Sequence, residues 1–196
     1  MIKNRRKKGT TLVEVLVSLV IMALVTTVVF FLFSNSNRTI SETEIKSQLQ
    51  QDVQSIQERF SKLGMESEGI SNIVFEPGST DKIKTLELKS ITTTENISGV
   101  ATTIYNIFNF NVDNGKLILQ TSEVSKTDST AEVINVVQTK ELSDNVKYIS
   151  VKPTNSSVAD LKLAKSININ ILVEKSKSRI TKTLEGETIV TFRNKN

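Results

Sequence analysis

A run of apolar residues close to the start of the chain constrains the fold more than any other feature. From Val15 to Phe33 there are 19 residues without a charged side chain, about 28 Å as an α-helix and close to the thickness of a bilayer hydrocarbon core. The nine residues before Thr10 form a basic leader with no acidic side chain; its basic residues are Lys3, Arg5, Arg6, Lys7 and Lys8. Because basic residues stay on the cytoplasmic side of such a segment, we expect the N-terminus to remain inside and the rest to be exported.

The formal net charge of +4 comes from this leader. Without residues 1–9 the chain keeps 20 Lys and Arg against 21 Asp and Glu. Nucleic-acid binding requires a basic face on the folded domain, and the overall charge gives no sign of one.

The residue types also restrict the chemistry that is open to the chain. It contains no Cys and no His, which excludes disulfides, thiolate or imidazole zinc sites and serine–histidine catalytic triads. Asn111, Asp113 and Asn114 do not have the spacing of an EF-hand calcium loop, and a hairpin turn explains them. We therefore predict no catalytic residues, no metal site and no cofactor.

A second helical segment is predicted after the apolar run. The polar residues Ser34–Thr39 are expected to kink or locally melt the helix, and Ser41 with Glu44 has the spacing of a capping box from which a helix restarts. Apolar side chains then recur at steps of three and four, typical of an amphipathic helix: Ile45, Leu49, Val53, Ile56, Phe60 and Leu63. Gly64 is expected to end this helix.

Beyond Gly64 the pattern changes to the alternation of apolar and polar residues that is typical of β-strands. Asp113-Asn114-Gly115 predicts a tight hairpin turn. Glu185 and Glu187 around Gly186 indicate a turn or bulge more than a catalytic carboxylate pair. Ser122–Thr130 and Thr154–Lys165 are expected to be loops. The predicted strands are Ile70–Phe75, Ile83–Leu88, Thr102–Phe110, Lys116–Thr121, Glu132–Gln138, Val146–Val151, Ser166–Glu174 and Ile180–Phe192.

These patterns predict an α+β fold in which a long N-terminal helix packs on an antiparallel β-sheet domain. A one-sided helix and a one-sided sheet each need a partner, and here each can cover the other. The expected organisation is a basic leader (1–9), a transmembrane or filament-core helix (10–33), its amphipathic continuation (34–64) and a β domain (65–196).

The residues that join the leader to the apolar run carry the functional signal. The segment Gly9-Thr10-Thr11-Leu12-Val13-Glu14 resembles the N-terminal motif of the type IV prepilin and pseudopilin family: glycine, usually phenylalanine, then Thr-Leu-(Val or Ile)-Glu. The resemblance implies that a prepilin peptidase cuts after Gly9, and that Thr10 becomes the mature N-terminus, whose amine is usually methylated in the family. Thr10 departs from the commoner phenylalanine, and this favours a minor subunit over a major one.

Glu14 is the one ionisable side chain between Thr10 and Phe33. Its burial near a bilayer centre would cost roughly 3 kcal/mol or more, and no Lys or Arg lies between Gly9 and Phe33 to pair with it. The resemblance implies that Glu14 of one subunit neutralises the Thr10 amine of another and so fixes the axial register. The alternative is that Glu14 lies near the membrane boundary and reaches for the headgroups.

The resemblance implies a structural subunit, a minor pilin or pseudopilin, made as a single-pass protein of the cytoplasmic membrane and then built into an extracellular pilus or pseudopilus. Its expected partners are other major and minor pilins, prepilin peptidase and the inner-membrane assembly platform. In its size, its amphipathic helix and its many short strands, the chain looks most like the PilW-like pilins and J-type pseudopilins. Those proteins help to initiate or cap a filament. Adhesion or twitching pili, competence pili and type II secretion pseudopili all remain open, and nucleic acid would be a partner only of a competence pilus.

Two other hypotheses remain. An exported binding protein with an ordinary signal peptide predicts a mature chain that starts near Asn37. A membrane-tethered domain without cleavage predicts a mature chain that still carries Met1.

Overall fold

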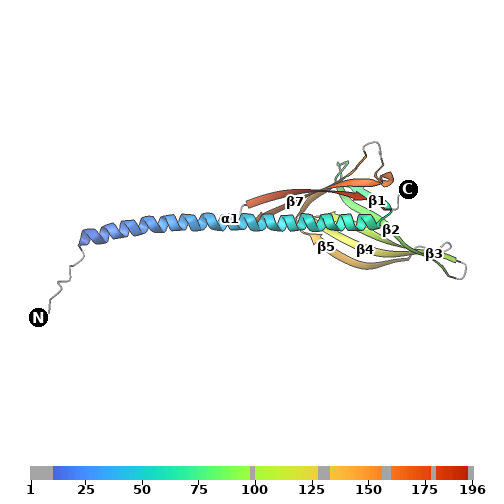
Figure 1. The fold of residues 1–196 in the computed structure, drawn as a ribbon, viewed down its shortest axis with the longest axis horizontal. Helices are drawn as coiled ribbons and strands as arrows, with labels where there is room; N and C mark the ends of the chain where they lie inside the picture. Colours follow the sequence, from blue (N-terminus) through green and yellow to red (C-terminus); the bar gives the residue numbers. More distant parts are fainter. Residues whose placement is uncertain (1–10, 98–99, 128–132, 156–159, 178–179, 194–196) are drawn as a thin grey trace. The chain divides into compact units, whose positions relative to one another are not determined.

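The computed structural model describes residues 11–97, 100–127, 133–155, 160–177 and 180–193 (Figure 1). The chain divides into two compact units, Met1–Glu44 and Ile45–Asn196. Helix α1 (Leu12–Glu66) supplies residues to both units.

The interruption expected at Ser34–Thr39 is wrong, because these residues are helical. The Thr39 hydroxyl donates to the Asn35 carbonyl (3.1 Å), and Arg38 pairs with Glu42 one turn later (3.2 Å). Serine and asparagine weaken a helix by only tenths of a kcal/mol each, which is too little to break one without proline or glycine. Ser41 consequently lies in the helix interior and begins no new helix.

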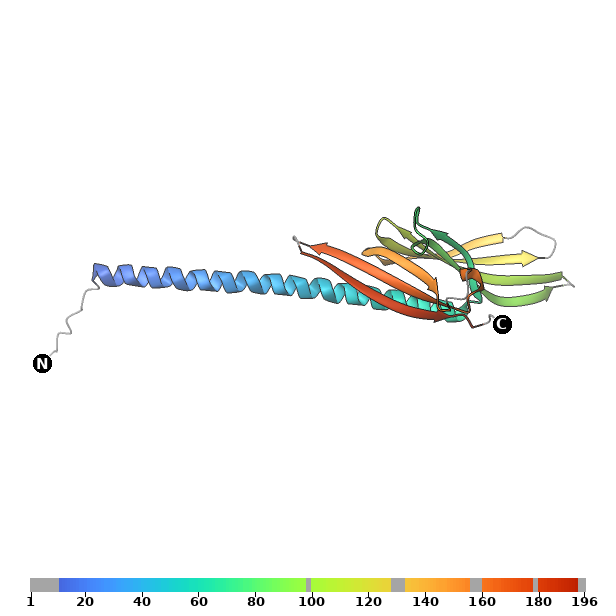
Figure 2. The ribbon, with the colours of Figure 1, turned by 90° about the horizontal axis from the view of Figure 1, so that it is seen from above.

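The second unit contains all eight predicted strands, in two antiparallel sheets (Figure 2). Five strands form one sheet in the order β1-β2-β3-β4-β5: β1 (Gly69–Phe75), β2 (Ile83–Ile97), β3 (Val100–Asp113), β4 (Lys116–Thr127) and β5 (Val133–Ser143). Three strands form the other: β6 (Val146–Pro153), β7 (Ser166–Lys177) and β8 (Ile180–Thr191). The α+β class with a helix on antiparallel sheets is confirmed.

The two predicted loops are only partly correct. Ser122–Thr127 continues β4 and pairs residue by residue with Thr102–Ile107 of β3, so the prediction of a loop there is wrong. Thr154–Lys165 contains the 3₁₀ helix η1 (Leu161–Leu163), capped by Asp160, whose carboxylate accepts from the Lys162 amide (2.9 Å). Residues 128–132 and 156–159 lie outside the described ranges.

The predicted helical stripe packs against both sheets and forms the centre of the core. All six of its apolar residues are buried: Ile45, Leu49, Val53, Ile56, Phe60 and Leu63. Phe60 stacks on Phe110 of β3 with ring centroids 4.1 Å apart, while alternate residues of β7 from Ile167 to Val173 face the same cluster. Each fully buried side chain of this size contributes about 1.5–3 kcal/mol, so the stripe fixes which helix face meets the sheets.

Two glycines allow α1 and β8 to approach closely. A Cβ atom at Gly64 would lie under 3.0 Å from a methyl of Val190, and one at Gly186 equally close to a methyl of Val53. Gly64 does not end the helix, which continues to Glu66, and Gly186 sits in a regular strand opposite Ile171. The predictions of a helix end at Gly64 and of a turn or bulge at Gly186 are both wrong. The two glycines are needed instead because α1 and β8 pack closely against each other at these positions.

Short connections tie the helix and the two sheets together. Asp52 of α1 accepts a hydrogen bond from the hydroxyl of Ser143, the last residue of β5 (3.1 Å), and another from the side-chain amide of Asn145, in the connection between β5 and β6 (2.7 Å). The β3–β4 turn has Asn114 and Gly115 at φ +49° and +82°, so the predicted tight hairpin turn is confirmed.

Candidate membrane-anchoring and assembly segment

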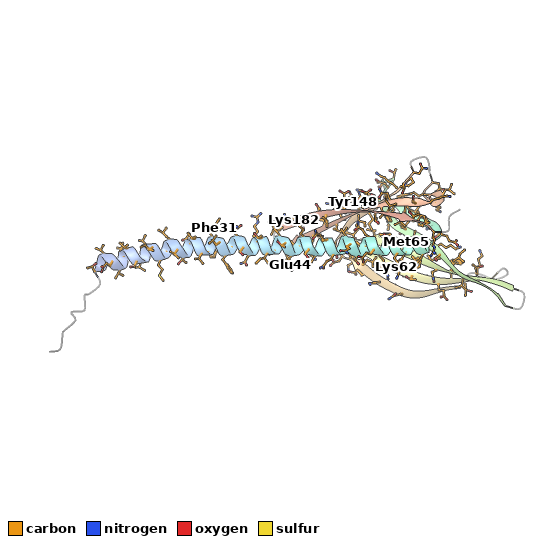
Figure 3. The ribbon with its side chains drawn as sticks, in the orientation of Figure 1. Phe31, Glu44, Lys62, Met65, Tyr148 and Lys182 are labelled. Carbon is orange, nitrogen blue, oxygen red and sulfur yellow. The ribbon has the colours of Figure 1, made fainter. Side chains whose placement is uncertain are left out.

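The first unit exposes an apolar helical surface. Every side chain from Leu12 to Phe33 is exposed, including Phe31, which projects from the helix in Figure 3. In the described chain one helix, α1, is long and apolar enough to cross a membrane, and its apolar part is wholly exposed. By length and composition this segment suits a bilayer or an apolar bundle of helices.

The polar side chains within this segment are satisfied by the helix itself. The hydroxyls of Ser18, Thr26 and Thr27 donate to the carbonyls of Glu14, Met22 and Ala23 at 2.7, 2.8 and 2.8 Å. These bonds to the preceding turn satisfy the hydroxyl donors within the helix, so the side chains need no hydrogen bond to water. The three hydroxyls therefore cost little in an apolar environment.

The start of α1 is a reciprocal capping box. The Glu14 amide donates to the Thr11 hydroxyl (3.3 Å), and the Glu14 carboxylate accepts from the Thr11 amide (2.9 Å). Sequence reasoning sought the partner of Glu14 among cations and missed this backbone donor. The Thr-x-x-Glu spacing directly before an apolar run was the signal that could have found it.

The capping box satisfies hydrogen bonds, but no Lys or Arg between Gly9 and Phe33 balances the charge of Glu14. The next basic residue after Glu14 is Arg38, 24 residues on, which corresponds to about 36 Å along an α-helix. The positive end of the helix dipole favours a carboxylate in the first turn, though by only about 0.3–1 kcal/mol at an exposed site. Glu14 is thus positioned by its own chain and still suited to meet a positive group from elsewhere.

The proposed processing site precedes the described residues. Gly9, Thr10 and the leader residues Lys3, Arg5, Arg6, Lys7 and Lys8 lie outside the described ranges. The bond between Gly9 and Thr10 comes one residue before the N-cap Thr11. Cleavage after Gly9 and methylation of Thr10 stay predictions.

The second unit carries exposed ion pairs of ordinary strength. Desolvation raises the pKa of Asp81, but the Ser79 hydroxyl (3.1 Å) and the Lys152 ammonium (3.4 Å) outweigh it and hold this pKa below its usual value of 3.8. Lys116 bonds Glu141 at 2.9 Å, which raises the lysine pKa. Among the described residues no group of three or more acidic side chains could hold a metal ion.

An apolar N-terminal helix whose continuation packs on antiparallel sheets is a pilin-like architecture. In agreement with it, the family described as the prokaryotic N-terminal methylation motif matches residues 4–30. This is the leader motif of type IV pilins, and the chain is consistent with a prepilin. The motif implies processing by prepilin peptidase and assembly with other pilins in general terms. No curated protein and no solved structure matches the chain.

Proposed function

We propose that this chain is a minor pilin or pseudopilin, a structural subunit of a type IV pilus or related filament. It is inserted as a single-pass membrane prepilin with its N-terminus in the cytoplasm, cut after Gly9 and assembled through α1. The observation that carries the proposal is the methylation motif at residues 4–30, which precedes and overlaps an exposed apolar helix that begins at Leu12.

Assembly in this proposal depends on a charge pair that cleavage creates. Removing the leader releases a positive amine at Thr10, four residues before the carboxylate of Glu14. One oxygen of that carboxylate accepts from Thr11, so the carboxylate keeps capacity for a further donor. Opposite charges attract strongly in apolar surroundings, and a pair between Glu14 of one subunit and the amine of another fixes their axial offset.

The finer assignments belong to the same proposal. Thr10 in place of phenylalanine supports a minor subunit, and the eight-stranded unit supports a PilW-like or J-type role in an initiating complex. Its partners are other major and minor pilins, prepilin peptidase and the inner-membrane platform. The mature location is an extracellular pilus or pseudopilus.

The test is the N-terminus of the mature chain, measured by intact mass and N-terminal peptide analysis in cells with and without prepilin peptidase. We expect a chain that starts at Thr10 and disappears without the peptidase. Gly9→Val should block cleavage, while the matched variant Thr10→Phe, which restores the commoner family residue, should still be cut.

The other hypotheses predict different masses from the same experiment. A mature chain starting near Asn37 would indicate an ordinary signal peptide, and one still carrying Met1 would indicate an uncleaved anchor. Either result would overturn the pilin assignment.

A further inference from the structure

Three basic residues gather where α1 runs beside β5, the edge strand of the five-stranded sheet. They are Arg59 and Lys62 of α1 and Lys140 of β5, here called the basic flank. None of their side chains forms an ion pair or a hydrogen bond with another described residue, and the Nε atom of Arg59 is buried without a partner. The described part of the chain therefore leaves all three cations unpaired.

Contacts of α1 show which side of the helix carries two of these cations. Asp52 accepts a hydrogen bond from Ser143 at the end of β5 (3.1 Å), so this side of the helix faces β5. Arg59 follows Asp52 by seven residues, nearly two whole turns, and so lies on the same side. Lys62 is three residues further on and adjoins Arg59 on the helix surface. Figure 3 labels Lys62 on the side of α1 where Figure 1 shows β4 and β5.

Pairing across the five-stranded sheet brings Lys140 to the same level. Phe60 of α1 stacks on Phe110 of β3, which pairs with Leu119 of β4, which in turn pairs with Lys140. Directly opposed residues share a sheet face, so Lys140 is on the face that covers the helix, and it is exposed at the sheet edge. Lys140 therefore lies beside the helix turn that contains Arg59. Like charges in this position repel, and an anionic partner would offset that cost.

The outer face of the three-stranded sheet carries the opposite charge. Gly186 of β8 faces α1, so its neighbours Glu185 and Glu187, here called the acidic pair, point away from the helix. The Glu185 carboxylate accepts from the side-chain amide of Asn170 (2.6 Å), and the Glu187 carboxylate accepts from that of Asn168. Amides carry no charge, and no cation of the described residues pairs with either carboxylate. The acidic pair is therefore open to an external cation.

The basic flank and the acidic pair lie on opposite sides of α1, and both belong to the second unit. Gln57 donates to the Glu187 carbonyl (2.8 Å) and Ser61 bonds to Thr188 (3.1 Å), so β8 runs along the side of the helix away from β5. The two surfaces of one subunit therefore do not meet each other. A contact between different surfaces on two copies is heterologous, and each copy can then bind one neighbour on either side. Such a contact can repeat along a filament.

We propose that the basic flank of one subunit binds the acidic pair, Glu185 and Glu187, of a second copy of this chain. The inference rests on filament assembly in the proposed function and adds to it a contact between the second units of neighbouring subunits. Guanidinium and ammonium groups bind carboxylates through charge-assisted hydrogen bonds, and the two surfaces have complementary charge. The contact gives Arg59, Lys62 and Lys140 the anionic partners that they lack within one chain.

The experiment is chemical crosslinking between two single-cysteine variants of the full-length chain, mixed in detergent. The chain has no cysteine, so Gln138→Cys places one thiol beside Lys140, and Thr183→Cys places one beside Glu185 on the same sheet face. Asn111→Cys on the outer face of the five-stranded sheet replaces Gln138→Cys in the control mixture. All three positions are exposed. A short bismaleimide links the thiols, and the dimer is quantified at about 0.05 M and about 0.5 M salt.

We expect the mixture of 138 and 183 variants to give more dimer than the control at low salt, and to lose most of it at high salt. Lys62→Glu with Lys140→Glu on the 138 chain should lower the dimer yield roughly tenfold, because two ion pairs are replaced by repulsion. Glu185→Lys with Glu187→Lys on the 183 chain alone should do the same. Mixing the two reversed chains should restore the dimer, which also shows that both are folded.

An equal change of charge elsewhere serves as the matched control. Lys84→Glu with Lys162→Glu on the 138 chain alters two exposed lysines outside the basic flank and should leave the dimer yield unaltered. A fall in yield equal to that of the flank variant would assign the effect to net charge and overturn the inference.

Three further results would overturn it. These are a yield no higher than that of the control mixture, no recovery when the two reversed chains are mixed, and a dimer that forms only after another pilin is added. The last would assign the basic flank to a different subunit. The mature N-terminus is measured separately by intact mass, so a failure of this contact leaves the proposed function standing.

Discussion

Gly186→Ala tests whether the glycines at positions 64 and 186 are required for the close packing of α1 on β8. The new methyl group would lie under 3.0 Å from a methyl of Val53 and 3.2 Å from Nε2 of Gln57. Gln57 is long and flexible, although its amide donates to the Glu187 carbonyl (2.8 Å). Val53 is β-branched and nearly confined to one rotamer in a helix. The strain therefore falls on the Val53 contact.

The expected cost follows from two opposing terms. Overpacking of a filled core costs typically about 1–3 kcal/mol, whereas alanine gains roughly 0.5–1 kcal/mol over glycine within a strand. The net destabilisation of Gly186→Ala should therefore lie between about 0 and 2.5 kcal/mol. Val53→Ala alone should cost about 2 kcal/mol, because it removes buried methyl groups and leaves a cavity.

The double variant, Gly186→Ala with Val53→Ala, separates this explanation from a general effect of alanine. The methyl group added on the strand fills the space that the shortened side chain on the helix vacates, so the pair should be more stable than the sum of the single effects by about 1–3 kcal/mol. Gly64 and Val190 form a reciprocal pair with the helix and strand roles exchanged. The variant Gly64→Ala gains about 1 kcal/mol of helix propensity, so a loss of stability there also has to come from contact.

The assay is pulse proteolysis of the full-length chain in detergent across a urea series, which reports unfolding of the second unit. Additivity within about 0.5 kcal/mol for both pairs would refute the close-packing account. So would a gain of stability in the single Gly→Ala variants, which would mean that the helix and strand can move apart without cost.

Three further predictions concern single side chains. Glu14→Gln keeps an acceptor for the capping box but removes the charge, so the chain should be cut normally yet be absent from sheared filaments; normal incorporation would contradict the charge-pair mechanism. Asp52→Ala leaves the Ser143 hydroxyl and the Asn145 amide without their acceptor and should cost about 1.5–3 kcal/mol in urea unfolding, with Asp52→Asn as the milder control. Because the folded-state pKa of Asp81 lies below 3.8, its contribution to stability is present above about pH 4 and is lost as pH falls through the folded pKa. In Asp81→Asn the free energy of unfolding should fall less steeply below about pH 4 than in the unmodified chain. The same acid dependence in both proteins would contradict a contribution from this ion pair.

Periodicity predicted the elements because burial repeats with the period of each structure. The steps from Ile45 to Leu63 match one helix face, and the alternation from Ile167 to Val173 matches one sheet face. Periodicity did not predict the ends of the strands, such as Ser122–Thr127, which was expected to be a loop. There the backbone pairing of β4 with β3 continues into polar serine and threonine residues that carry little apolar signal.

The capping box shows why a local pattern needs its context. Both Thr11-x-x-Glu14 and Ser41-x-x-Glu44 have the required spacing, but only the first is a cap. At Ser41 the following amides already bond to carbonyls of the preceding helical turn, so no donors remain to be capped. At Thr11 no helical turn precedes, and the amides are free. A correct prediction therefore requires knowing first that the polar stretch at Ser34–Thr39 stays helical.

The two glycines were beyond local reasoning because their partners are distant. Gly64 meets Val190 and Gly186 meets Val53, more than a hundred residues away in each case. A glycine near a helix end or between two glutamates looks like a stop or a turn from the sequence alone. Only the packing of α1 on β8 shows that these positions require a residue without a side chain.

The apolar segment poses the opposite problem, because it is apolar all round and so distinguishes no face for packing. Apolar helices in a bilayer associate through van der Waals packing and interhelical hydrogen bonds, so a polar group with an open partner site can help to fix the axial register. Ser18, Thr26 and Thr27 already donate to their own helix, so they offer no donor to a neighbour. The Glu14 carboxylate accepts from the uncharged Thr11 amide and keeps capacity for a further donor. In the proposed filament, Glu14 is thus the group in the described part of this segment that can define one axial offset between subunits.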